Sequence, residues 1–214
     1  MNTYIFDLDG TLVDSIESIA YFANSALEEY GIQSVEVEKY KGFVGDGART
    51  LIRRAMEYRG SSSPELLEQV LRRYNETYDD NYLYLCKVYE GIDDLIRTLR
   101  DRGFKTGVLS NKPHSTTVKI VEALFGKESF DFVYGQREGV ALKPHPDSIL
   151  NLIESHSLKR EDCVYVGDTM TDVMTGKNAG IFTVGVLWGF RDREELETYG
   201  ADKIAALPVD VIVG

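Results

Sequence analysis

The chain has 214 residues, of which 43% are apolar and 28% are charged, so it is long enough for one large domain or a domain with an insertion. Its formal net charge of −11 argues against a nucleic-acid partner. Two cysteines exclude a disulfide framework, and the lack of a signal-like start or a membrane-length apolar run predicts a cytoplasmic protein with no membrane partner.

The predicted elements begin with a short strand over residues 3–6, which ends at Asp7. Helices are predicted next, over 15–30, 48–58 and 64–82, with no strand between them. Helices over 90–102, 113–125, 146–155 and 170–178 then alternate with strands over 105–109, 132–134, 163–166 and 182–186. This alternation predicts an α/β fold with a Rossmann-like parallel sheet core. The core takes residues 1–14 and 83–214, and an inserted α-helical domain takes residues 15–82.

Polar and ionisable residues follow several of the predicted strands. They are Asp7 to Thr11 after the first, Ser110 to Lys112 after the second, Lys143 in a later loop, and Asp168 to Asp172 after the fourth. Ligands of open parallel sheets bind beyond the carboxyl ends of the strands. We therefore expect these residues to meet at one edge of the sheet and to form a single site.

The predicted site is rich in carboxylates. Asp7, Asp9, Asp168 and Asp172 would together carry a charge of about −4, and a phosphate monoester would add about −2. Lys143 offsets only one of these charges, so the site requires a cation. Because the candidate ligands are all oxygens, Mg²⁺ is favoured over Zn²⁺. Crowding of carboxylates also raises the pKa of one of them, which would supply a general acid.

Other interpretations of these motifs are weaker. Asp7 to Gly10 alone could be an ordinary turn. A calcium-binding EF-hand loop is excluded because Leu12 and Ser18 stand where glycine and glutamate are required. Gly45 and Gly47 begin a dinucleotide-binding fingerprint, but Thr50 replaces its third glycine.

Four segments resemble, in the correct order, the four motifs of the haloacid dehalogenase (HAD) superfamily. They are residues 6–15, 109–113, 143–146 and 166–172, and the resemblance covers essentially the whole chain. Segments 44–49 and 184–190 further resemble the phosphoglycolate phosphatase-like branch. The resemblance implies a HAD-like core with a helical cap domain, and a magnesium-dependent phosphatase. The cap is expected to close over the strand ends and to choose the substrate.

The resemblance also implies a role for each site residue. Asp7 would attack phosphorus and form an aspartyl-phosphate, and Asp9 would protonate the leaving oxygen and then activate water. Mg²⁺ is expected on the Asp7 and Asp168 carboxylates and the Asp9 carbonyl, with Asp172 either a direct ligand or a support. Phosphate and substrate would be bound or neutralised by Gly10, Thr11, Ser110, the Asn111 N–H, Lys143 and, in the helical domain, Arg49.

The substrate implied by this branch is a small phosphorylated metabolite, with 2-phosphoglycolate as the first choice. An inorganic pyrophosphatase and a β-phosphoglucomutase-like phosphotransferase stay open, as does a regulatory protein that binds a phosphorylated ligand without catalysis. A dehalogenase is disfavoured, because that branch implies a different residue at position 9 and no metal aspartate at 168. The sequence does not decide between a monomer and a homodimer.

Overall fold

The computed structural model describes residues 1–213 and divides the chain into two compact units. The first consists of Met1–Asp14 together with Val88 onward, and the second of Ser15–Lys87. The helical insertion therefore ends at residue 87, rather than at 82 as predicted from the sequence.

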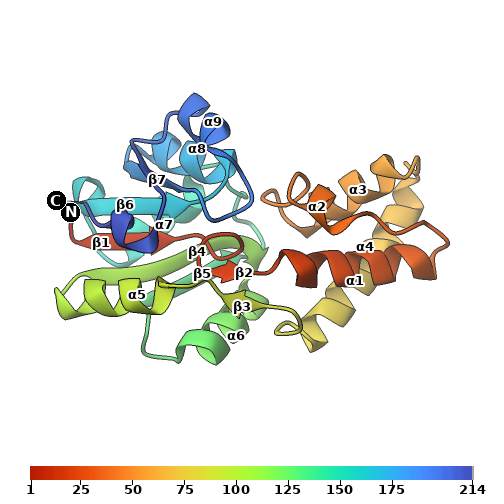
Figure 1. Ribbon diagram of the computed structural model, residues 1–214, viewed down its shortest axis with the longest axis horizontal. Coiled ribbons are helices and arrows are strands. Elements are labelled where there is room, and N and C mark those ends of the chain that lie inside the picture. Colours follow the sequence, from red (N-terminus) through yellow and green to blue (C-terminus); the bar gives the residue numbers. More distant parts are fainter. Residues whose placement is uncertain (214) are drawn as a thin grey trace. The chain divides into compact units, whose positions relative to one another are not determined.

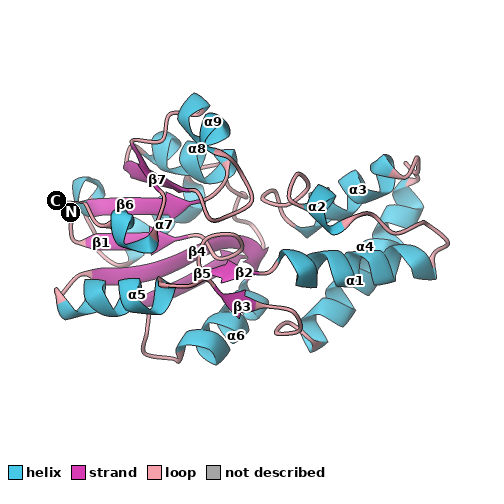
Figure 2. Ribbon diagram, in the orientation of Figure 1, coloured by secondary structure: helices cyan, strands magenta, loops and turns pink. Residues whose placement is uncertain are grey.

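The first unit contains a six-stranded sheet with the strand order β5-β4-β1-β6-β7-β8 (Figures 1 and 2). Its strands are β1 (Thr3–Phe6), β4 (Lys105–Pro113), β5 (Phe132–Gln136), β6 (Cys163–Gly167), β7 (Phe182–Val186) and β8 (Lys203–Ala205). Each neighbouring pair is parallel, which confirms the predicted α/β class. The chain builds outward from β1 in both directions, so the carboxyl end of β1 is a topological switch point.

The central strands are buried along their whole length. Every residue of β1 and β6 is buried, as expected for parallel strands covered on both faces. The core behind them is a cluster of buried side chains: Ile5, Leu109, Phe132, Ile149, Leu152, Ile153, Cys163, Tyr165, Ala179 and Ile181.

The helices that alternate with these strands along the chain pack against the sheet. They are α5 (Ile92–Asp101), α6 (His114–Phe125), α7 (Asp147–Ser155), α8 (Met170–Ala179) and α9 (Arg193–Thr198), with short 3₁₀ helices at Arg160–Asp162 and Pro208–Val211. Helix α6 contacts β4 and β5, and α8 contacts β6 and β7. At the start of α8 the main-chain N–H and hydroxyl of Thr169 both donate to Asp172, at 3.1 and 2.7 Å. This N-terminal cap fixes the Asp172 carboxylate.

The second unit is helical. It contains α1 (Ile16–Glu29), α2 (Val37–Tyr40), α3 (Ala48–Tyr58) and α4 (Pro64–Asp80). Helix α1 packs on α2 and α4, and α3 packs on α4. Phe22 of α1 meets Tyr78 of α4 edge to face, with ring centroids 5.4 Å apart. Within residues 1–213, none of the helices has the length and apolar character that crossing a membrane requires.

The structure corrects several predicted boundaries. The strand predicted to end at Leu109 continues as β4 to Pro113, with an irregularity in its pairing to β5, so Ser110 to Lys112 lie within the strand. Strands β2 (Val13–Asp14) and β3 (Lys87–Val88) form a separate two-stranded sheet that was not predicted. Two residues are too few to show a strand periodicity, which explains the omission. Helix α2 and strand β8 were also not predicted.

Candidate active site

Three predicted carboxylates meet at the carboxyl ends of β1 and β6. Asp7 directly follows β1, Asp168 directly follows β6, and Asp172 lies in the first turn of α8. One carboxylate oxygen from each lies within 4.8 Å of the others, and all three residues are buried. The strand order places these ends side by side, because β1 pairs with β6 from Thr3–Cys163 to Phe6–Val166.

Lys143 enters this group from the loop that follows β5. Its ammonium nitrogen lies 2.9 Å from Asp7 Oδ1 and 2.7 Å from Asp172 Oδ1, and its side chain is only 2% exposed. It also donates to the Tyr165 hydroxyl at 2.9 Å, and that hydroxyl in turn donates to the Leu109 carbonyl at 3.1 Å. Burial acts to lower the pKa of Lys143, but Asp172 and Asp7 raise it well above its ordinary value. The side chain is therefore a buried cation.

Asp7 has an unusual environment for a carboxylate. Burial raises its pKa to about 7; Lys143 lowers the pKa, whereas Asp172 and Asp9 raise it further. Asp7 Oδ1 lies 2.9 Å from Lys143 Nζ, and that ammonium is the ion-pair partner of this oxygen. The ion pair leaves acceptor capacity on the Asp7 carboxylate, because each carboxylate oxygen can accept more than one bond.

The other two aspartates differ in how many protein donors they accept. Asp168 accepts one hydrogen bond on each oxygen, from the Thr11 hydroxyl at 3.1 Å and the Phe190 N–H at 2.8 Å. Asp172 has more of its acceptor capacity occupied, since its Oδ1 contacts Lys143 and its Oδ2 accepts both hydrogen bonds from Thr169. Asp168 therefore retains acceptor capacity for a cation, whereas Asp172 holds Lys143 and the start of α8.

Burial raises the pKa of Asp168 well above its ordinary value, and the nearby Asp172 and Asp7 raise it further. The hydrogen bonds from Phe190 and Thr11 act in the opposite direction. A divalent cation would relieve the repulsion between these buried carboxylates.

These residues fit a hard divalent cation. Within residues 1–213 the three carboxylates form a candidate metal group with oxygen donors alone. The remaining acceptor capacity of the Asp7 and Asp168 carboxylates is suited to Mg²⁺, which prefers oxygen ligands. Asp172 fits a supporting role better than direct ligation.

Glycines leave no room around Asp168. A Cβ on Gly10 would lie 2.3 Å from Asp168 Oδ2, and a Cβ on Gly189 would lie 2.3 Å from Asp168 Cβ. Gly10 also has a φ of 87°, a conformation that other residues rarely adopt. Gly10 therefore lets the loop after β1 approach the Asp168 carboxylate, and its predicted contact with phosphate stays a prediction.

Thr11 is held in the same loop from two sides. Its hydroxyl donates to Asp168, and its carbonyl accepts from the Trp188 indole N–H at 3.0 Å. These contacts hold the loop that carries Asp7 and Asp9, and the predicted contact of Thr11 with phosphate stays a prediction.

The end of β4 supplies the remaining predicted residues. Ser110 and Asn111 are buried there. The Asn111 side chain donates to the Lys143 carbonyl at 3.0 Å and accepts from the Lys143 N–H at 2.9 Å. Asn111 therefore fixes the main chain of Lys143, and its own N–H remains the group predicted to bind a phosphoryl oxygen.

Two residues of the site were not assigned a role from the sequence. The Lys112 ammonium contacts both carboxylate oxygens of Asp9, at 2.9 and 3.1 Å. The Tyr165 hydroxyl lies 2.9 Å from Lys143 Nζ. Lys112 could have been noticed because it lies two residues after Ser110. Tyr165 gave no signal, because a strand buried on both faces does not reveal which side chains face a site.

Arg49 lies in the helical unit. It belongs to α3 and forms a two-bond ion pair with Glu68 of α4, at 2.5 and 2.7 Å. Both side chains are exposed, so this pair adds little stability. Binding of a substrate carboxylate by Arg49 stays a prediction.

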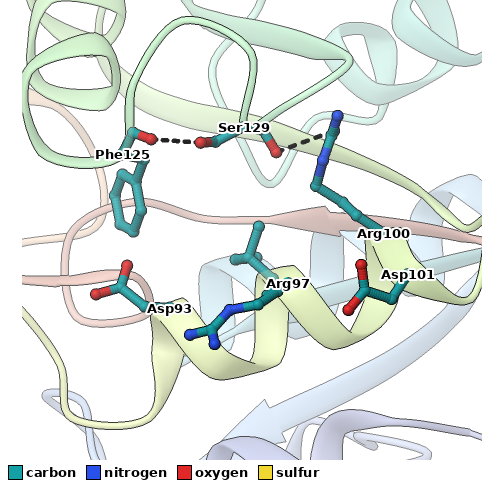
Figure 3. A pocket seen from close by; sticks show the side chains of 7 residues that line it. Asp93, Arg97, Arg100, Asp101, Phe125 and Ser129 are labelled. Atoms are coloured by element: carbon teal, nitrogen blue, oxygen red, sulfur yellow. Dashed lines mark hydrogen bonds between the residues drawn. The ribbon is translucent and has the colours of Figure 1, made fainter.

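A pocket of about 310 Å³ lies elsewhere in the α/β unit, along α5 and the segment between α6 and β5 (Figure 3). It is lined by Asp93, Ile96, Arg97, Arg100, Asp101, Phe125 and Ser129. Two of its polar side chains bond within the protein, since Ser129 donates to the Phe125 carbonyl and Arg100 donates to the Ser129 carbonyl. None of the predicted site residues lines it.

Comparisons with known proteins identify the family of this chain. The model of the haloacid dehalogenase-like hydrolase family matches residues 4–186. The phosphoglycolate phosphatase of Vibrio parahaemolyticus serotype O3:K6 is 31% identical over 204 residues, covering 94% of this chain and 90% of that protein. The phosphoglycolate phosphatase of Haemophilus influenzae strain KW20 is 31% identical over 191 residues, covering 86% and 85%.

A solved structure from Lactobacillus delbrueckii subsp. bulgaricus has the same fold. It is 31% identical to this chain and superposes with a TM-score of 0.92, covering 98% of this chain and 96% of its own.

Proposed function

This chain belongs to the haloacid dehalogenase-like hydrolase family and is a phosphatase, and from that premise we propose that it hydrolyses a small phosphate monoester through an aspartyl-phosphate on Asp7. The observation that carries the proposal is the buried Lys143, whose ammonium lies 2.9 Å from a carboxylate oxygen of Asp7. A nucleophile beside a buried cation can approach an anionic phosphoryl group that it would otherwise repel.

Each residue then has a defined part in two steps. An Asp7 oxygen bonds to phosphorus while the bond to the leaving oxygen breaks, and Asp9 gives that oxygen a proton. In the second step Asp9 takes a proton from water, which attacks phosphorus and releases Asp7 and inorganic phosphate. Lys143, the Ser110 hydroxyl and the Asn111 N–H stabilise the charge on the transferred group.

We assign Mg²⁺ to the Asp7 and Asp168 carboxylates and the main-chain carbonyl of Asp9. Bound there, it would neutralise charge on the nucleophile and on the transferred phosphoryl group. Asp172 acts indirectly, because both of its oxygens already contact protein donors. We therefore propose the supporting role for Asp172, one of the two roles that the sequence left open.

The first test is phosphate release from 2-phosphoglycolate, pyrophosphate and an aryl phosphate, each with Mg²⁺ and with EDTA. We expect release to require Mg²⁺ and kcat/KM to be highest for 2-phosphoglycolate, the substrate class named for the relatives. Preference for pyrophosphate would keep the mechanism and change the substrate. No release from any of the three would overturn the proposal.

The second test concerns stability as pH and Mg²⁺ change. The pKa of Asp7 is raised to about 7 in the folded protein, so between about pH 4 and 7 the metal-free fold holds a proton that the unfolded chain has released. The stabilisation from this group is thus fully present below about pH 4 and is lost as pH rises through 7. Mg²⁺ must displace that proton, and its stabilising effect therefore has the opposite pH dependence.

We expect saturating Mg²⁺ to raise Tm by about 5–10 °C at pH 8, given about 2.7 kcal/mol at a hundredfold excess over Kd and about 2–4 °C per kcal/mol for a chain of this size. The increase should be small at pH 5.5. Differential scanning fluorimetry of wild type and Asp7→Asn, with EDTA or Mg²⁺ at both pH values, measures this. An equal shift at both pH values would exclude Asp7 as the proton-linked ligand.

A further inference from the structure

The side chains of Lys112 and Asp9 form an ion pair that the two-step mechanism does not use. The ammonium lies 2.9 Å from one carboxylate oxygen of Asp9 and 3.1 Å from the other. The Lys112 side chain is 7% exposed and that of Asp9 is 17% exposed, so water screens the pair only weakly. It is therefore better ordered than a surface ion pair.

Both ends of this pair are attached to rigid main chain. The Lys112 N–H donates to the Ser110 hydroxyl at 3.3 Å, and the Lys112 carbonyl accepts from the Thr117 hydroxyl at 3.2 Å. Asp9 lies in the loop after β1, where the Gly10 N–H donates to the Val13 carbonyl at 2.9 Å. The contact thus connects two elements whose positions the sheet already determines.

The two lysines of the site serve different carboxylates. Lys143 contacts Asp7 and Asp172, whereas Lys112 contacts Asp9. An unrestrained aspartate side chain distributes itself among several rotamers, and only a carboxylic acid whose protonated oxygen faces the leaving oxygen can transfer a proton to it. A cation beside both oxygens restricts this freedom, and it can keep its contact with one oxygen when the other carries the proton.

We propose that Lys112 is a positioning residue: in the first step it contacts one oxygen of Asp9, while the other oxygen, which carries the proton, faces the leaving oxygen. This inference rests on the proposed function, in which Asp9 is the acid of the first step. Because Lys112 acts through Asp9, its removal should lower the rate most for substrates whose leaving group needs a proton from Asp9. The leaving oxygen of a weakly acidic alcohol needs the proton in order to depart, whereas an acidic phenol departs as its anion without it.

The test is kcat/KM, which reports the steps up to departure of the leaving group, for a series of phosphate esters. The series runs from 4-nitrophenyl phosphate through phenyl phosphate to an alkyl phosphate, with Mg²⁺ present. For Lys112→Met we expect a loss of about threefold or less with the nitrophenyl ester and of about 10–100-fold with the alkyl ester, a part of the 10²–10⁴-fold typical of general acid catalysis. Lys112→Arg keeps a charge able to pair with both oxygens, so its loss of kcat/KM should rise along the ester series less steeply than that of Lys112→Met. It also provides a second variant if the first fails to fold.

Two controls separate positioning from other roles. Lys127→Met removes the same charge from an exposed side chain that lies 3.8 Å from Glu122, and it should leave the whole series unchanged. In an Asp9→Asn background, Lys112→Met should cause no further loss with the alkyl ester, because residues that act through one group are not additive.

The outcomes distinguish the two proposals. Wild type without activity on 2-phosphoglycolate, pyrophosphate and every ester of this series overturns the proposed function itself. An active wild type with an equal loss for all esters in Lys112→Met would show that Lys112 contacts the substrate instead of Asp9. Unchanged or faster turnover of the alkyl ester would also overturn the inference.

Discussion

Asp7→Asn is expected to lower kcat for phosphate release by about 10⁴-fold or more, because an amide cannot form the aspartyl-phosphate on which both steps depend. The variant should fold normally. It replaces a buried carboxylate with a neutral group of the same shape, and burial is the main cause of the raised pKa of Asp7. In EDTA we expect its Tm at pH 8 to equal or exceed that of wild type.

Steady-state phosphate release together with acid-quenched mass spectrometry tests this expectation. A phosphoryl adduct should be found on the peptide containing Asp7 in wild type and be absent from the variant. Asp94→Asn is the matched control, since Asp94 is 78% exposed in an ion pair with Arg97 on α5. If Asp7→Asn kept a tenth of the activity, another residue would have to be the nucleophile.

Lys143→Met is expected to lower both activity and stability. Loss of the ammonium removes a charge that stabilises the transferred phosphoryl group, and comparable losses reduce kcat by about 10²–10³-fold. It also leaves the buried carboxylates of Asp7 and Asp172 facing each other without a cation. Removing one partner of a buried ion pair destabilises a protein by about 3–5 kcal/mol.

Urea unfolding in EDTA at pH 8 and pH 5.5 measures the second effect. The destabilisation should be smaller at pH 5.5, where Asp7 takes up a proton and the repulsion falls. Lys143→Arg should not restore activity, because a guanidinium is larger than an ammonium and presents a different geometry at this buried position. Equal stability of Lys143→Met and wild type at both pH values would contradict the ion-pair network.

The sequence predicted the main helices and strands well where the pattern of apolar residues extended over the whole element. The helix predicted over 48–58 is α3, and the strand predicted over 182–186 is β7. It could not predict that β4 continues through Ser110 to Lys112, because polar residues after an apolar run normally indicate a loop. That continuation holds these side chains on the sheet instead of on a mobile connection.

The position of the site was also predictable, because polar residues after parallel strands must meet at one edge. Its internal contacts were not. Lys112 and Asp9 are 103 residues apart, and nothing in either segment indicates that their side chains meet. The Asn111 side chain bonds to the main chain of Lys143, a contact that depends on the path of a loop and on no sequence pattern.

The pairing of β2 with β3 bears on how such a gene can diversify. Asp14 ends one strand and Lys87 begins the other, so the chain leaves and re-enters the α/β unit through two strands that pair with each other. A segment whose ends are held together can be lengthened, shortened or exchanged at a small entropic cost, because loop closure depends only weakly on length. The hydrolytic residues and the helical insertion can therefore be inherited as separate modules. Duplicated copies can keep the former while recombination and drift reshape the latter.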